Sequence, residues 1–165
     1  AYQFTEQFGI RSYIYGHDES FSDSSQVRLH LFSDPDLHDG KALMRISNMN
    51  AMENNRDGLP LQFCCEQMLK NETAKNLYVI TISDGAPAAE AYGFTNGRAD
   101  IQNVIRKYSR MGINFITAGV GSDCENIKAI YCDGLDRVAA DYLSIEDPGK
   151  LAKTFVGILK KKMAA

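Results

Sequence analysis

The chain has 165 residues, 44% of them hydrophobic, and a formal net charge of -3. Such a chain is long enough to form one globular domain with its own core, and its weak negative charge offers no electrostatic basis for binding nucleic acid. We recognise no signal peptide and no apolar stretch long enough to cross a membrane. The four cysteines are not spaced like the C-x-x-C pairs of zinc or redox sites, so we expect reduced thiols in a cytoplasmic protein.

The hydrophobic pattern predicts short strands and helices along the chain. Apolar residues before Gly9 suggest the end of an amphipathic helix, and two alternating segments predict a hairpin joined by the polar stretch 18–25. In chain order the expected elements are strands over 11–17 and 26–32, a helix over 36–46, a loop over 47–58, a helix over 59–69, a strand over 77–82, a loop over 86–97, a helix over 100–111, a strand over 113–120, a helix over 123–131, a strand over 137–143 and a helix over 148–162.

The strongest of these signals is the strand over 77–82. An apolar, mostly β-branched run ends there abruptly in Ser83, Asp84 and Gly85. A run without polar alternation is typical of a parallel strand that is buried on both faces. Because ligands of open α/β sheets bind at the carboxyl ends of the strands, the pattern places Asp84 at a candidate site.

The alternation of helices and strands after residue 58 indicates the fold class. It is typical of an α/β fold with a doubly wound, mostly parallel sheet and helices on both faces, of the Rossmann-like kind. We find no internal repeat and no low-complexity tract, so we interpret residues 1–165 as a single domain.

Two aspartates are candidate metal ligands. Asp84 follows the buried strand, and Asp57 lies in the loop just before the helix that leads into that strand. In a doubly wound sheet both loops reach the same edge, where carboxylate oxygens suit a hard cation such as Mg²⁺. The alternative for each residue is structural: Asp84 would cap the turn after its strand, and Asp57 would be the N-cap of the helix.

Two further patterns are weaker. Residues 18–22, Asp-Glu-Ser-Phe-Ser, match the metal-binding pattern Asp-x-Ser-x-Ser, but a strand follows where that pattern should lead into a long helix, so we interpret them as a hairpin loop. Residues 119–124, Gly-Val-Gly-Ser-Asp-Cys, resemble a dinucleotide-binding fingerprint but lack its third glycine and its acidic residue.

Asn55-Arg-Asp-Gly58, the helix after it and Tyr78-Val-Ile-Thr-Ile-Ser-Asp-Gly-Ala-Pro87 together resemble the von Willebrand factor A (vWA) domain. The most similar variety is the intracellular bacterial type of cobaltochelatase subunits and nitric oxide reductase activation proteins, and the resemblance covers most of the chain. It implies a metal-ion-dependent adhesion site (MIDAS), in which three loops bind a divalent cation. The second and third of these loops map onto Asp57 and Asp84, and an acidic residue of a partner protein completes the metal's shell.

The first strand of that family and its Asp-x-Ser-x-Ser loop have no counterpart here. The resemblance therefore implies an N-terminally truncated domain with an incomplete site for Mg²⁺ or Mn²⁺, or else a degenerate domain that has lost the site. The missing strand would lie between the strands over 11–17 and 77–82 and leave two rows of backbone groups unpaired. We expect self-association or a strand-completing chain, with Tyr13, Val79 and Ile80 carrying the exposed surface.

The expected function is protein–protein interaction through this site. The resemblance implies an assembly that contains an ATPase of the chelatase or chaperone type. We do not expect catalysis, because the sequence shows no nucleophile–base pair. Two alternatives stay open: a Mg²⁺-dependent phosphate-ester hydrolase that uses Asp84 as a ligand and Arg56 and Arg98 as phosphate-binding cations, and a structural module without a metal.

Overall fold

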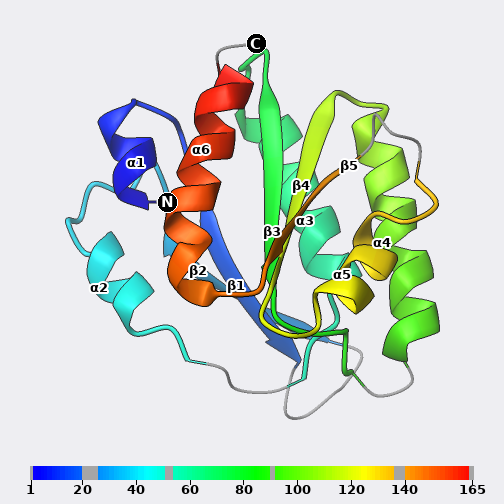
Figure 1. Cartoon of the computed structure of the whole chain (residues 1–165). Helices are drawn as coiled ribbons and strands as arrows, with labels where there is room; N and C mark the ends of the chain where they lie inside the picture. Colours follow the sequence, from blue (N-terminus) through cyan, green and yellow to red (C-terminus); the bar gives the residue numbers. More distant parts are fainter. Residues whose placement is uncertain (1, 20–25, 51–53, 90–91, 136–139, 164–165) are drawn as a thin grey trace.

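A computed structural model describes residues 2–19, 26–50, 54–89, 92–135 and 140–163 (Figure 1). No helix in this described part is long and apolar enough to span a membrane. The elements in chain order are α1 (Tyr2–Gln7), β1 (Ile14–Glu19), β2 (Val27–Ser33), α2 (Ala42–Ser47), α3 (Gly58–Asn71), β3 (Leu77–Ser83), α4 (Gly93–Ser109), β4 (Ile113–Val120), α5 (Cys124–Tyr131), β5 (Ala140–Ile145), a 3-10 turn (Pro148–Lys150) and α6 (Leu151–Met163).

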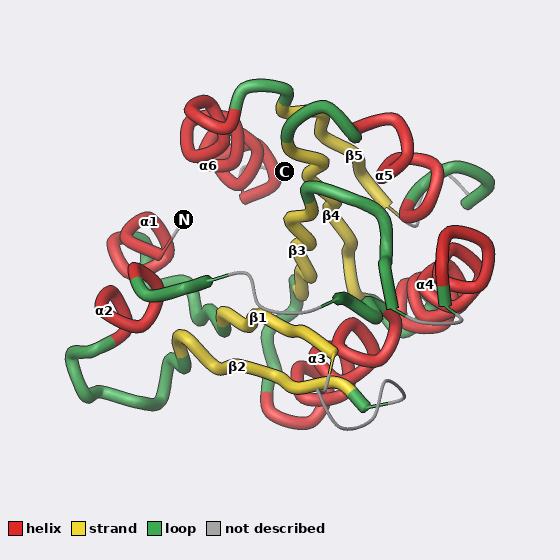
Figure 2. Tube along the Cα trace, turned by 90° about the horizontal axis from the view of Figure 1, so that it is seen from below, coloured by secondary structure: helices red, strands yellow, loops and turns green. Residues whose placement is uncertain are grey.

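The strands β3, β4 and β5 form a parallel sheet with β4 in the middle. Val79 of β3 pairs with Phe115 of β4, which pairs in turn with Ala140 of β5. Helices α4 and α5 cover one face of this sheet and α6 covers the other (Figure 2). The structure therefore confirms an α/β fold in which helices flank a parallel sheet. The predicted strands over 77–82 and 113–120 correspond to β3 and β4.

The main core lies between the parallel sheet and the helices α3, α4 and α5. Its buried side chains come at helical spacing from α4 and α5, since residues three or four positions apart lie on one face of a helix. On the opposite face of the sheet, Phe155 and Leu159 of α6 pack against Ile80. The largest fully buried apolar and aromatic side chains of the main core are Ile101, Ile105, Tyr108, Ile127, Ile130 and Tyr131.

The expectation that Val79 carries exposed surface is wrong. Its side chain is only 8% exposed and belongs to the main core, while the next residue, Ile80, faces α6. Successive side chains of a strand point to opposite faces, and both faces of β3 are covered by helices. The exposed apolar residue of this strand is Ile82, which is 51% exposed.

The strands β1 and β2 form a separate antiparallel sheet, as the predicted hairpin requires. Its connecting residues, 20–25, lie outside the described residues. Tyr15 of β1 stacks on Tyr13 and meets the ring of Phe63 on α3 edge to face, with ring centroids 5.9 Å apart. Within the part of the chain that the structure describes, no ladder joins β1 to β3, so the strands form two sheets instead of one.

Several predicted boundaries are wrong. Helix α4 begins at Gly93, inside the expected loop over 86–97, and Gly97 lies within it. Gly97 is a packing residue, since a Cβ atom there would lie 3.0 Å from the ring of Tyr92. Helix α2 begins only at Ala42, because turns in which Asp34 and Asp39 accept backbone hydrogen bonds occupy the preceding residues.

The boundaries of the last two elements also differ from those predicted. Strand β5 runs to Ile145, two residues beyond the predicted strand over 137–143, whose first three residues lie outside the described part. The helix expected from residue 148 starts as a 3-10 turn and becomes α-helical at Leu151. Boundaries of this kind depend on hydrogen bonds that hydrophobic periodicity does not report.

The cysteines are free thiols, and burial should suppress their reactivity. Burial raises the pKa of Cys65 to about 12 and the pKa values of Cys64 and Cys132 to about 11. Because the thiolate is the nucleophile, we expect iodoacetamide to modify these three cysteines at least about tenfold more slowly in native protein than in urea. Peptide mass spectrometry measures each rate, and equal rates in the two states would contradict the prediction.

Candidate functional site

The candidate site lies at the C-terminal ends of the parallel strands, where the loops after β3 and before α3 meet. Asn55 joins the two loops. Its carbonyl oxygen accepts hydrogen bonds from the backbone N–H groups of Ala88 (3.2 Å) and Ala89 (3.1 Å), and its side-chain Oδ1 accepts from Ala88 (3.1 Å). The loop that carries Asp57 is thus tied to the loop that follows Asp84, and both lie at the edge of the sheet that the sequence indicated.

The end of β1 reaches the same loop. The backbone N–H of Glu19 donates to the carbonyl oxygen of Asn54 at 2.7 Å, and His17 Nε2 lies 3.6 Å from Asp57 Oδ1. Two buried polar atoms at this end of β1, His17 Nδ1 and Glu19 Oε1, have no hydrogen-bond partner among the described residues. Buried polar atoms usually have a hydrogen-bond partner, so these two atoms mark the end of β1 as unusually polar for a buried position.

Asp57 is a buried acceptor and does not cap α3. Its side chain is 4% exposed and makes no capping hydrogen bond, although the residue precedes the helix. Its Oδ1 accepts from Asn55 Nδ2 at 2.8 Å, and its Oδ2 accepts from the Tyr131 hydroxyl of α5 at 2.6 Å. Burial, and then the Asp57 charge, raise the pKa of Tyr131 well above its usual value, so this hydroxyl remains a donor. Asp57 therefore occupies the N-cap position of α3, as the structural alternative predicted, but its side chain forms no capping hydrogen bond.

Gly58 completes the contacts of the Asn-Arg-Asp-Gly motif. Its backbone N–H donates to the Tyr92 hydroxyl at 3.1 Å, and that hydroxyl donates to Asp100 Oδ2 of α4 at 2.6 Å. The guanidinium carbon of Arg56 lies 4.6 Å from the centre of the Tyr92 ring. The motif therefore fastens the start of α3 to both α4 and α5, which holds the loop of Asp57 in one position.

Asp84 differs from Asp57 in its exposure and in its contacts. It is exposed, and the structure shows no hydrogen bond or ion pair for its carboxylate among the described residues. The neighbouring Ser83 hydroxyl donates to the carbonyl oxygen of Gly85 at 2.8 Å, which stabilises the turn without Asp84. Across the described residues no three His, Cys, Asp or Glu side chains converge as a metal cage. Asp84 is therefore the residue of the pair that is accessible to a ligand.

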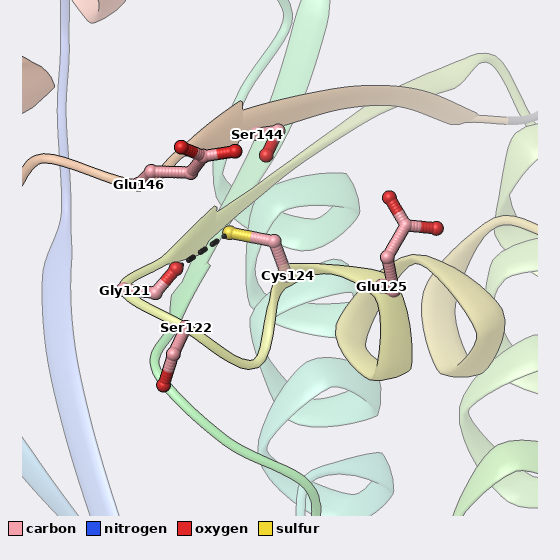
Figure 3. Close-up of a pocket in the computed structure, with 6 residues that line it drawn as sticks. All are labelled: Gly121, Ser122, Cys124, Glu125, Ser144 and Glu146. Carbon is pink, nitrogen blue, oxygen red and sulfur yellow. Dashed lines mark hydrogen bonds between the residues drawn. The ribbon is translucent and has the colours of Figure 1, made fainter.

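A second feature of this edge, a pocket of about 350 Å³, was missed by sequence reasoning. It lies where β4 and β5 end and α5 begins (Figure 3). The Cys124 thiol donates to the carbonyl oxygen of Gly121 at 3.1 Å, and the Tyr142 hydroxyl donates to that of Cys124. Segment 119–124, which resembles a dinucleotide-binding fingerprint, contains three of its lining residues and is the sequence signal that could have indicated the pocket. The residues that line the pocket are Gly121, Ser122, Cys124, Glu125, Ser144 and Glu146.

The weaker pattern at residues 18–22 falls partly outside the described residues, which include only Asp18 and Glu19 of it. Asp18 lies in β1 and is buried, and its carboxylate accepts from Arg28 Nε at 2.7 Å. Burial alone would raise the pKa of Asp18, but the hydrogen bonds from Arg28 and His30 outweigh burial and lower it. Asp18 thus has a cationic partner on the neighbouring strand β2.

No model of a known protein family matches this chain, and no curated protein matches it either.

Proposed function

We propose that this chain is a vWA-like domain that binds a partner protein through a divalent cation at the C-terminal edge of its parallel sheet. Asp84 would hold Mg²⁺ or Mn²⁺ directly, Asp57 would add negative charge behind it, and an acidic residue of the partner would complete the coordination. The observation that supports this most is the set of hydrogen bonds that Asn55 accepts from Ala88 and Ala89, which join the two loops named by the resemblance. The partner class, an assembly with a chelatase- or chaperone-type ATPase, rests on the resemblance.

The two aspartates fit the ion unequally. Asp84 is exposed and has no partner among the residues that the structure describes, which suits Mg²⁺, an ion that keeps several of its waters and takes one or two carboxylates. Both oxygens of Asp57 already accept hydrogen bonds inside the protein. Asp57 therefore suits contact with the ion through a water molecule, and a site formed by these two residues is weak.

The engagement of Asp57 also favours a second candidate, a structural module of the same fold that binds its partner without a metal. In that case Asp57 serves only to fasten α3 to α5, and Asp84 is a surface residue. The two candidates differ in one measurable respect. Only the first predicts that a divalent cation at modest concentration binds Asp84 in preference to other carboxylates.

We expect Mn²⁺ to bind this chain weakly, with a dissociation constant of about 1 mM or above, and to bind at Asp84. Amide NMR spectra recorded during a Mn²⁺ titration should lose the signals of Gly85 and Ala86 first, because the paramagnetic ion broadens its neighbours. Asp84→Asn should abolish this preference. The matched control is Asp123→Asn, which removes a half-buried aspartate after β4, the neighbouring strand, whose Oδ1 accepts from Asn126. Unselective broadening would favour the module without a metal.

The hydrolase alternative is tested on the same protein. Arg98, one of its two candidate cations, donates to the carbonyl oxygen of Asp133 at 2.9 Å, and Arg56 lies over Tyr92. Neither contact brings a guanidinium to Asp84. We therefore expect no Mg²⁺-dependent turnover of para-nitrophenyl phosphate, and turnover that Asp84→Asn removes would replace the interaction proposal with the hydrolase.

A further inference from the structure

We propose that His17 and Glu19 of β1 form a binding site for a divalent transition-metal ion such as Zn²⁺. The inference goes beyond the proposed function, because it uses neither Asp84 nor Mg²⁺. It rests on two buried polar atoms, His17 Nδ1 and Glu19 Oε1, which have no hydrogen-bond partner. They are two of the four buried side-chain atoms of this kind in the part of the chain that the structure describes.

The two side chains lie on the same face of β1. Residues two positions apart in a strand point to one side of it, and their Cα atoms are about 6.6 Å apart. A histidine and a glutamate at this spacing can direct a nitrogen and an oxygen to a common point between them. The two atoms do not bond to each other, so a nitrogen and an oxygen are both open to an ion at that point.

The Asp57 carboxylate determines which nitrogen of His17 is open to an ion. His17 Nε2 lies 3.6 Å from Asp57 Oδ1, and both oxygens of Asp57 act as acceptors, for the Asn55 amide and the Tyr131 hydroxyl. An accepting carboxylate favours the proton on the ring nitrogen that faces it, which leaves the lone pair on Nδ1. Histidine ligands of metals commonly donate their other N–H to a carboxylate in this way. Asp57 is therefore a positioning residue of this site.

The Glu19 carboxylate supplies negative charge. Its side chain is 6% exposed, and burial of a carboxylate without a compensating partner is costly because the group loses its hydration. The adjacent buried carboxylate, Asp18, has a cationic partner, since Arg28 Nε donates to its Oδ1 at 2.7 Å. A metal ion would give Glu19 the cation that Asp18 has in Arg28.

The two donor atoms determine the class of ion. An imidazole nitrogen together with a carboxylate oxygen suits Zn²⁺ or Co²⁺, whereas Mg²⁺ takes oxygen ligands. Two protein ligands leave the remaining positions to water, which agrees with the finding that no three such side chains converge in the described part. The His17 side chain is 27% exposed, so an ion with its waters can enter beside the ring.

The probe is Zn²⁺, added to the whole chain and followed by NMR of the histidine ring nitrogens. The His17 Nδ1 signal should shift on binding while Nε2 keeps its proton, and an excess of Mg²⁺ should not reverse the change. In isothermal titration, His17→Ala and Glu19→Gln should each weaken Zn²⁺ binding about tenfold or more. His30→Ala is the matched control, because His30 pairs with Gly16 and thus lies on the other face of the hairpin.

Asp84→Asn separates this inference from the proposed function. It should leave the Zn²⁺ affinity unchanged, as His30→Ala should, even though it removes the site proposed for Mg²⁺ or Mn²⁺. Loss of Zn²⁺ binding in Asp84→Asn would show that the ion occupies the other site and would overturn the inference.

Glu19→Gln also keeps the test independent of folding. Without zinc this variant should be no less stable than the unaltered protein, because it replaces a buried carboxylate by a neutral group of the same shape. With Zn²⁺ at about ten times its dissociation constant, the melting temperature of the unaltered protein should rise by about 3–5 °C. That of Glu19→Gln should not.

Three further results would overturn the inference. One is a Zn²⁺ affinity that neither His17→Ala nor Glu19→Gln changes. Another is a shift of His17 Nε2 in place of Nδ1, which would mean that Asp57 does not orient the ring for this site. The third is the absence of binding at about 1 mM Zn²⁺, which would mean that a buried water molecule occupies the space between the two atoms.

Discussion

Replacing Asp57 with alanine should lower the free energy of unfolding by about 3 kcal/mol. The change removes the acceptor of the Tyr131 hydroxyl, which is buried with a side chain 1% exposed, and of the Asn55 amide. The buried Tyr131 hydroxyl and the half-buried Asn55 amide then lose this acceptor, and a buried donor without a partner costs about 1–3 kcal/mol. The loss should be visible as a lower midpoint with an unchanged slope in urea unfolding followed by circular dichroism.

The matched control is Asp84→Ala, which we expect to change stability by no more than about 0.5 kcal/mol, because its carboxylate is exposed. A double-mutant cycle with Tyr131→Phe isolates the contact between Asp57 and Tyr131. Additive effects of the two substitutions, or equal losses for the two aspartates, would show that Asp57 is not the buried acceptor described above.

Gly58→Ala should destabilise the protein by about 2–3 kcal/mol. A Cβ atom on Gly58 would overlap the Asp100 carboxylate and lie 2.9 Å from the Tyr92 hydroxyl. Alanine normally stabilises a helix relative to glycine by about 0.5–1 kcal/mol, so the expected sign is opposite to the helix propensity. Thermal and urea unfolding of the variant measure the loss.

Gly85→Ala is the control for this substitution, because nothing lies within 4 Å of a Cβ atom built there. We expect it to be neutral or slightly stabilising. Asp100→Ala in the Gly58→Ala background should recover part of the lost stability by removing the overlapping carboxylate. A Gly58→Ala protein as stable as the Gly85→Ala protein would contradict the prediction and would show that the Asp100 side chain moves aside at little cost in stability.

The sequence predicts the parallel strands well because their signal is local. The runs of β3 and β4 are mostly apolar and β-branched and end at small or polar residues, so the hydrophobic pattern alone predicts them. The start of α4 has no such signal. The helical position of Gly97 is explained only by its close approach to Tyr92, and that contact depends on tertiary packing.

The candidate site was predictable in position but not in detail. The rule that loops gather at the carboxyl ends of parallel strands places Asp57 and Asp84 at one edge. The role of Asp57 depends on Tyr131, which is 74 residues away in the chain, and no spacing within the motif indicates that partner. The pocket beside Cys124 likewise combines residues of β5, of α5 and of the loops that follow β4 and β5, so no single segment of the sequence predicts it.

The distribution of the two sheets along the chain bears on how the protein folds. The parallel sheet and its helices α4 and α5 come from the contiguous residues 77–145, whereas the hairpin and α2 come from residues 14–47. A hairpin pairs residues that are close in sequence, so it forms faster than parallel strands that a helix separates, and units of unequal stability open separately. We expect the hairpin to pair early, to dock through Tyr15 and Phe63, and to open first in the native protein because its strands lie outside the parallel sheet and the main core.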